Sequence, residues 1–321
     1  MRRFPRPRIV VSACLEFDEV RYDGKVVPCP VVKELKPYVD FLKICPEYEI
    51  GLGVPRDPLR IVSIGGRERL IQPRTGRDIT DPMDVFTDRL IVSLPPVDGF
   101  LFKSGSPTIG FYNIKVYDKP VGAGVAGRTS GLFARKILRR YHDYPLEDDL
   151  RMKNGKIRDE FLTKIFAFAG FREAAEAGDP DQVRDFHDRN RYLFMCYDTD
   201  AESMLDGALA RGNSEYFNEM RRLLSKHRTS EGYAGVAMRI FELYGDRLSS
   251  GEKAWFRALV AKYLKNKVSR DALLDTLELF AVRMSDWKTA DQTVFAPYPQ
   301  ELVPDVDQRL DRDYWKAVSI Q

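Results

Sequence analysis

Residues 8–15 read RIVVSACL, a continuous apolar run that contains a cysteine near its end. Such a run is typical of a strand buried on both faces of a parallel sheet. Two further strand-like runs occur at residues 43–50 and 99–103, and a fourth occurs at residues 113–117. These runs make the first part of the chain the place to expect a sheet.

Helix-like segments alternate with these strands. Apolar residues at helical spacing predict helices at residues 30–42 and 132–141, and an Asp-Pro start predicts another at residues 81–94. We read the glycine-rich stretch at residues 121–131 as a loop. The alternation predicts an α/β layered domain over residues 1–150.

The composition changes after about residue 150. Strand-like runs disappear, and long segments carry apolar residues three and four positions apart, separated by turns marked by Gly, Asn, Asp and Ser. This pattern is typical of helices that pack against one another. The sequence predicts an all-α domain over residues 151–321.

The bulk composition is that of an ordinary globular protein, with 44% hydrophobic and 31% charged residues among 321. No apolar run approaches the roughly 20 residues that a membrane helix needs, so no membrane contact is expected. We read the first apolar run as a strand and not as a signal peptide, which predicts a cytoplasmic location. The four cysteines do not form the pattern of a disulfide framework.

Reactive side chains lie in or just after three of the predicted strands. Cys14 is near the end of the first strand, and Cys45 and Glu47 lie in the second. Lys103 ends the third strand, and Ser106 follows it in the next loop. The carboxyl ends of parallel strands emerge at one edge of a sheet, so these groups are expected to share one crevice. Arg21 and Arg56 lie beside turn glycines and are suited to anchoring a loop or an anionic group. With Lys103 they are the candidates for binding substrate.

Three separated motifs carry a family resemblance. The patterns SACLxxxxVRYDG, CPExxxGLxVPR and KSxSPxxG occur in this order, and the series resembles the thiouracil and thiouridine desulfidases, the TudS and RudS proteins. The phrases KHRTSEGY, LSSGEK and FAPYPQEL in the second half resemble the YbgA-like helical domain. The resemblance implies removal of sulfur from a thiolated pyrimidine, either thiouracil or thiouridine in tRNA.

The resemblance also implies a cofactor and roles for named residues. In the family, three cysteine thiolates hold a [4Fe–4S] cluster and leave one iron open to take the sulfur. By motif, Cys14 and Cys45 match two cluster ligands. Glu47 matches the general acid or base, and Ser106 matches an assisting serine.

One position departs from the family pattern. The third ligand lies in an SPSCG loop in the family, whereas this chain reads SPTIG and places Ile109 there. Three alternatives remain open. Cys29 could replace the missing ligand, a carboxylate or an exogenous sulfur could do so, or the chain could be a cluster-free protein that binds RNA or a nucleotide without desulfidase chemistry.

The distribution of charged residues indicates which binding partners to expect. The net charge of +3 is too small to indicate nucleic acid by itself. Basic runs at residues 135–140, 221–228 and 262–267 lie near Tyr141 and Tyr263 and could follow a phosphate backbone, although such runs are usually solvated helix faces. The expected partner is a thionucleotide or tRNA.

Overall fold

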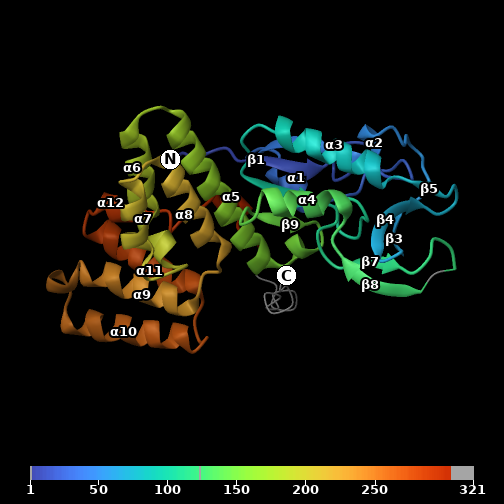
Figure 1. The fold of residues 1–321 in the computed structure, drawn as a ribbon. Helices are drawn as coiled ribbons and strands as arrows, with labels where there is room; N and C mark the ends of the chain where they lie inside the picture. Colours follow the sequence, from blue (N-terminus) through green and yellow to red (C-terminus); the bar gives the residue numbers. More distant parts are fainter. Residues whose placement is uncertain (1, 123, 305–321) are drawn as a thin grey trace. The chain divides into compact units, whose positions relative to one another are not determined.

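The computed structural model describes residues 2–122 and 124–304. Contacts divide these residues into two units. One unit is Arg6–Phe161, and the other is Leu162–Val303 together with residues 2–5. The first unit contains both sheets and the second contains only helices, which confirms the predicted fold class (Figure 1).

A parallel four-stranded sheet forms the centre of the first unit. Its strand order is β2-β1-β6-β9, where the bounds are β1 Arg8–Ser12, β2 Asp40–Ile44, β6 Gly99–Phe102 and β9 Leu146–Asp148. The helices of this unit are α1 Pro30–Leu35, α2 Pro46–Glu49, α3 Thr80–Ser93 and α4 Leu132–Arg140. β1, which is the first apolar run, is buried almost throughout and lies between two parallel neighbours, as a doubly covered strand requires.

A second, mixed sheet belongs to the same unit. Its order is β5-β4-β3-β7-β8, with β3 Arg60–Ile64, β4 Arg67–Gln72, β5 Arg77–Asp78, β7 Ile114–Tyr117 and β8 Val125–Thr129. Ile61, Leu70 and Val116 of this sheet pack in one hydrophobic core with Phe133 and Ile137 of α4. Figure 1 shows these strands gathered at one end of the unit and α3 along its top.

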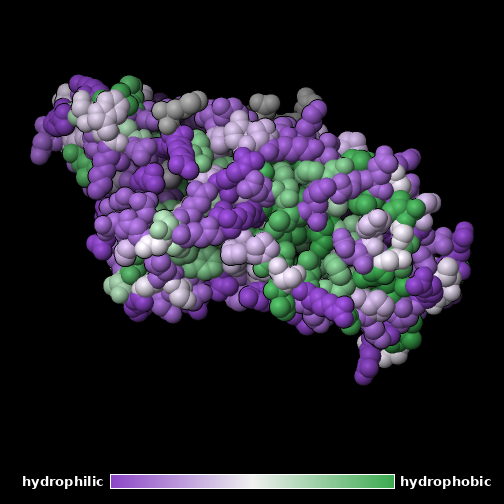
Figure 2. Space-filling model, turned by 90° about the horizontal axis from the view of Figure 1, so that it is seen from above, coloured by the Kyte–Doolittle hydropathy of each residue, from purple (hydrophilic) through white to green (hydrophobic). Residues whose placement is uncertain are grey.

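Hydrophobic side chains also reach the surface of this unit. α3 exposes Val85 and Val92 on the side that faces away from the core. In the view from above, hydrophobic residues gather over part of the right-hand half of the surface, with hydrophilic residues around them (Figure 2).

Several predicted elements differ from the observed ones. The helix expected at residues 30–42 ends at Leu35, because Pro37 cannot continue it, and β2 begins at Asp40. The strand expected at residues 43–50 ends at Ile44, since Pro46 starts a helix for which Cys45 is the N-terminal cap residue. The strands over residues 60–78 were not predicted, and β8 and β9 were not predicted either.

Helices build the second unit. They are α5 Gly155–Glu176, in which the boundary between the units falls, then α6 Pro180–Met195, α7 Ala201–Leu209, α8 Asn213–Ser225, α9 Ser230–Glu242, α10 Ser250–Leu264, α11 Arg270–Arg283 and α12 Trp287–Ala290. Aromatic rings fill its core, including Phe241 stacked on Phe256 at 4.4 Å between ring centroids. No helix among the described residues is long and apolar enough to cross a membrane.

Candidate active site

A cavity of about 320 Å³ lies in the first unit where the four-stranded sheet ends. It brings together seven of the eight residues that the sequence singled out, and Cys29 is the exception. The seven are Cys14, Arg21, Cys45, Glu47, Arg56, Lys103 and Ser106. The roles assigned to them remain predictions, but a ligand in this cavity could meet all seven.

The topology explains this convergence. β1 lies between β2 and β6, and all three run in the same direction, so their carboxyl ends open at one edge. Cys14 follows β1, Cys45 follows β2, and Lys103 follows β6. The backbone N–H of Lys103 donates to the hydroxyl of Ser12 at 2.8 Å, which ties two of these strand ends together.

Glu47 is held from two sides. Nε of Arg56 lies 2.7 Å from Oε2 of Glu47, and the Thr108 hydroxyl donates to Oε1 at 2.7 Å. The side chains of Arg56 and Glu47 are only 4% and 13% exposed. A carboxylate that is fixed in this way is oriented before any ligand arrives, as a general base must be.

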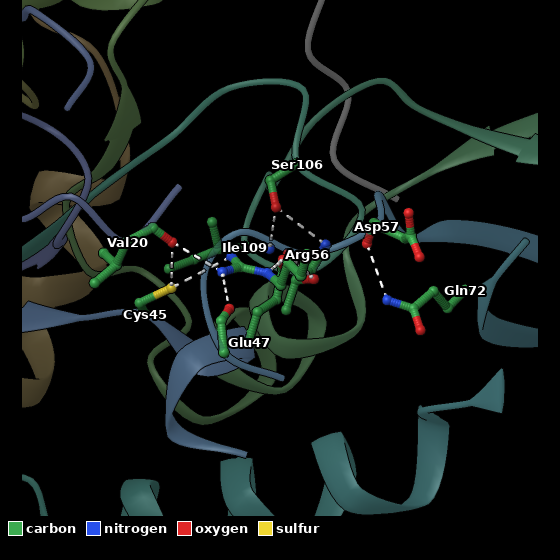
Figure 3. Close-up of polar contacts among 10 residues, drawn as sticks. Val20, Cys45, Glu47, Arg56, Asp57, Gln72, Ser106 and Ile109 are labelled. Carbon is green, nitrogen blue, oxygen red and sulfur yellow. Dashed lines mark hydrogen bonds and ion pairs between the residues drawn. The ribbon is translucent and has the colours of Figure 1, made fainter. Parts of the chain in front are cut away.

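The guanidinium of Arg56 has further partners. Its Nη1 donates to the carbonyl oxygens of Val20 and Gly53, each at 3.0 Å, and its Nη2 lies 3.7 Å from Sγ of Cys45. Figure 3 shows Arg56 between Cys45, Glu47 and Val20. These contacts match the loop-anchoring alternative for Arg56, and its binding of substrate stays a prediction.

The loop that carries Ser106 is a compact turn. The Ser106 hydroxyl accepts hydrogen bonds from the backbone N–H groups of Thr108 and Ile109, both at 3.2 Å (Figure 3). Its own proton remains available for donation to a ligand. Gly110 ends the turn, and a side chain there would meet the carbonyl oxygen of Ser106 at 2.7 Å.

The two other cationic residues of the cavity have carboxylate partners. Nζ of Lys103 lies 3.0 Å from Asp149, and Nη1 of Arg21 lies 3.0 Å from Asp23. Both cations are therefore partly neutralised. The predicted binding of an anionic group would have to compete with these pairs.

The two cysteines of the cavity are electrostatically coupled. Burial, together with the neighbouring Cys45, raises the pKa of the Cys14 thiol to about 11. Burial also raises the pKa of Cys45, and the guanidinium of Arg56 opposes that shift. The Cys45 thiol donates to the carbonyl of Val20 at 3.5 Å.

Cys29 is outside the cavity lining, although its thiol interacts electrostatically with Lys103, which does line the cavity. It is buried and is the N-terminal cap residue of α1, and its backbone N–H donates to the carboxylate of Glu16 at 2.5 Å. It does not line the cavity. The role of Cys29 as a replacement cluster ligand stays a prediction.

The donors in the cavity do not fit a cubane held by three cysteines. Two thiols line it, and Ile109, at the third motif position, is 5% exposed and packs in the hydrophobic core. Over residues 2–122 and 124–304, no group of three His, Cys, Asp or Glu side chains is placed to hold a metal ion. A [4Fe–4S] cluster with three protein thiolates therefore has no matching donor set here.

Comparison with known families identifies the two parts of the chain. Residues 9–149 match a family described as 2-thiouracil desulfurase. The first unit is therefore similar to this family over the matched residues. Every residue that lines the cavity lies within the matched range. Residues 191–299 match a family described as a protein of unknown function, DUF1722, and this match lies in the helical unit.

Two further comparisons complete this result. A solved structure described as the [4Fe–4S]-dependent thiouracil desulfidase TudS is 25% identical in sequence. It aligns with 46% of this chain and 94% of its own, with a TM-score of 0.36. No curated protein matches the chain.

Two residues of the site escaped the sequence reasoning. Thr108 fills a variable place in the SPTIG loop, so its bond to Glu47, 61 positions away, had no signal in the sequence. Asp149 follows β9, a three-residue strand too short and too acidic to be recognised. The paired acids at residues 148–149 were the available hint.

Proposed function

We propose that the first unit replaces the sulfur of a thiolated pyrimidine by oxygen in the cavity between Cys14, Cys45 and Glu47. A fixed carboxylate and two thiols share one opening, and this observation carries the proposal. At about 320 Å³, the cavity is at the small end of the roughly 300–1,000 Å³ range of ligand sites and suits a single base.

The reaction is a hydrolysis. The oxygen of a water molecule bonds to the thiocarbonyl carbon, the C–S bond breaks, and the sulfur leaves as hydrosulfide while the carbonyl forms. No electrons are exchanged, so no oxidant or reductant is required. The reaction in this proposal runs on the chain's own residues.

Each residue has a defined task in this reaction. Glu47, held by Arg56 and Thr108, takes the proton from the attacking water. The sulfurs of Cys14 and Cys45 provide a soft, polarizable surface for the thiocarbonyl sulfur. The Ser106 hydroxyl donates to a polar atom of the pyrimidine ring.

The test follows thiocarbonyl absorbance and released sulfide with 2-thiouracil, 4-thiouracil and 4-thiouridine. In ¹⁸O-labelled water, the product must carry the label. Glu47→Gln should lower the rate by roughly 10²–10⁴, the usual contribution of a general base. Glu49→Gln is the matched control, because Glu49 lies on the same helix, is exposed and does not line the cavity.

The iron content of the active protein distinguishes this hydrolysis from a reaction that needs a cluster. The protein is assayed as purified in air and after anaerobic incubation with iron and sulfide. Activity without bound iron supports the hydrolysis described above. Activity that appears only on reconstitution, in proportion to bound iron, contradicts it and favours cluster chemistry with a third ligand from outside the three motif positions.

A second candidate function is binding without chemistry. Ile109 in place of the third motif cysteine favours it, because the site then lacks a family ligand. A thiolated pyrimidine that binds in the cavity, with no sulfide released under either condition, would support this candidate over the first.

A further inference from the structure

Tyr22 places an aromatic ring at the wall of the cavity in the first unit. Among the described residues that line this cavity, Tyr22 alone has an aromatic ring. The residue is 39% exposed, so its ring is not enclosed in the core. The hydrolysis proposed above gives it no task. An exposed ring at the wall of a ligand site is a surface that a bound ligand covers.

The backbone at Tyr22 is fixed from two sides. Residues 21–24 form a turn, which is closed by a hydrogen bond from the N–H of Gly24 to the carbonyl of Arg21 at 2.9 Å. Gly24 has a φ of +73°, a conformation that glycine adopts without strain. The backbone N–H of Arg56 donates to the carbonyl of Tyr22 at 2.8 Å. The point from which the ring projects is therefore set before a ligand binds.

Arg56 connects this turn to the predicted base. Its backbone holds Tyr22, while its guanidinium donates to the carbonyl of Val20 at 3.0 Å and pairs with Glu47 at 2.7 Å. Figure 3 shows the contacts of Arg56 with Val20 and Glu47. One residue thus fixes both the turn that carries the ring and the carboxylate that acts in the reaction.

Arg21 covers one face of the Tyr22 ring. The carbon of its guanidinium lies 4.9 Å from the ring centroid, and its Nη1 lies 3.0 Å from Asp23. The negative face of an aromatic ring attracts a cation in this position. Because Asp23 holds Arg21 there, the opposite face of the ring is the one against which a ligand can stack.

A pyrimidine ring suits such a surface. It is flat and conjugated, and flat rings stack on aromatic side chains in an offset arrangement. The aliphatic residues of the wall, Ile44, Pro58 and Leu59, contact any apolar ligand and do not distinguish a flat ring from a puckered one. A stacked ring makes this distinction, because both partners must be flat.

We propose that Tyr22 stacks on the ring of the bound thiopyrimidine and makes the site select flat, conjugated thiocarbonyl rings over saturated ones. This inference rests on the proposed function, because it names the residue that recognises the ring of the same substrate. Tyr22 covers one face of the substrate ring, so the water that Glu47 activates attacks the thiocarbonyl carbon from the other face.

A binding experiment tests the stack without any reaction. The full chain is titrated by calorimetry with uracil and with dihydrouracil, which have the same N–H and carbonyl groups and no sulfur to lose. Only uracil is flat and conjugated, so the parent chain should bind it more tightly. Tyr22→Ala should weaken uracil binding roughly tenfold and dihydrouracil binding less than about threefold, as expected for the loss of one stacked base.

Two further variants serve as controls. Tyr22→Phe keeps the ring and should keep the preference for uracil. Tyr112→Ala removes a tyrosine that is 38% exposed and does not line the cavity, so it should leave both affinities unchanged. Thermal unfolding of each variant checks that the fold is intact.

Turnover of 2-thiouracil gives a second readout. Attack of water changes one carbon of the substrate ring, so most of the stack persists from the bound substrate to the transition state. Tyr22→Ala should therefore raise KM about as much as it weakens uracil binding and change kcat less than about twofold. Glu47→Gln acts on kcat instead, which separates the ring contact from the chemistry.

Several results would overturn the inference. They are no binding of uracil by the parent chain, an equal loss for uracil and dihydrouracil in Tyr22→Ala, and an equal loss in Tyr22→Ala and Tyr112→Ala. Conversion of 2-thiouracil with a KM that Tyr22→Ala does not change rejects the stack and leaves the proposed function standing. A preference for uracil that depends on Tyr22, in a chain that releases no sulfide, rejects the function and supports the stack.

Discussion

Arg56 and Glu47 form a buried ion pair at the edge of the cavity, with Nε and Oε2 2.7 Å apart. The same guanidinium reaches the Cys45 sulfur and two backbone carbonyls, so one side chain fixes both the predicted base and one of the two cavity thiols. Arg56 is therefore a positioning residue, and the geometry of the site depends on it.

Removal of Arg56 should be costly. Arg56→Ala leaves the Glu47 carboxylate buried without its cation, and we expect a loss of about 3–5 kcal/mol in the free energy of unfolding. Denaturant unfolding measures it. Arg74→Ala is the control. Arg74 forms an ion pair with Asp57, but its side chain is 83% exposed, so this ion pair should contribute less than about 1 kcal/mol to the free energy of unfolding. Equal losses in the two variants would contradict the structural role of Arg56.

Thr108 should contribute to stability and turnover through its hydroxyl group, and not through its methyl group. Thr108→Val removes the hydrogen bond to Glu47 in a buried position, and we expect a loss of about 1.5–3 kcal/mol in unfolding free energy, typical of a bond to a charged group. Thr108→Ser keeps the hydroxyl and should restore most of any lost turnover. Turnover and unfolding are measured for both variants, and identical behaviour of Val and Ser would refute the assignment.

Ile109 should control whether iron is held. Ile109→Cys supplies a third thiol at the cavity, so after anaerobic reconstitution this variant should retain iron and sulfide that the parent chain does not retain. Iron analysis and visible absorbance measure the difference. Adding Cys29→Ser to the Ile109→Cys variant should leave iron content unchanged, because Cys29 does not line the cavity. A loss of iron on Cys29→Ser would instead make Cys29 a ligand.

The helical unit should lose a stabilising contact in acid. Hydrogen bonds from Ser249 and the guanidinium of Arg283 lower the pKa of Glu252 from 4.5 to about 2. A carboxylate with a depressed pKa in the folded state stabilises the fold above about pH 4.5, and this contribution disappears as the pH falls toward 2. Glu252→Gln should therefore destabilise the unit at pH 7, and its difference from the parent chain should shrink steadily below pH 4.5.

Thermal unfolding across this range tests the effect. Ser249→Ala, which removes the cap of α10, should cost about 1 kcal/mol at neutral pH. A difference between Glu252→Gln and the parent chain that does not change between pH 7 and pH 3 would contradict the link to this carboxylate.

The local spacing of apolar residues predicted the longer helices of the first unit well. α3 and α4 begin and end within a residue of the expected bounds, because a full amphipathic helix with a clear start needs little help from its neighbours. The short strands of the second sheet were missed, since β3 and β4 mix apolar and basic residues and β5 has two residues. β3 pairs with β7, which is distant in the sequence, while β4 pairs with β3 and β5 with β4.

The sequence by itself determined that Cys14, Cys45 and Lys103 would lie in or next to strands, and that these groups would share one edge of a parallel sheet. That follows from periodicity and from the direction of parallel strands, both of which are local rules. Only the tertiary structure decided that Thr108 and Arg56 hold Glu47, that Asp149 pairs with Lys103, and that Cys29 does not line the cavity. These contacts join side chains from different loops, and their positions depend on how the whole unit packs.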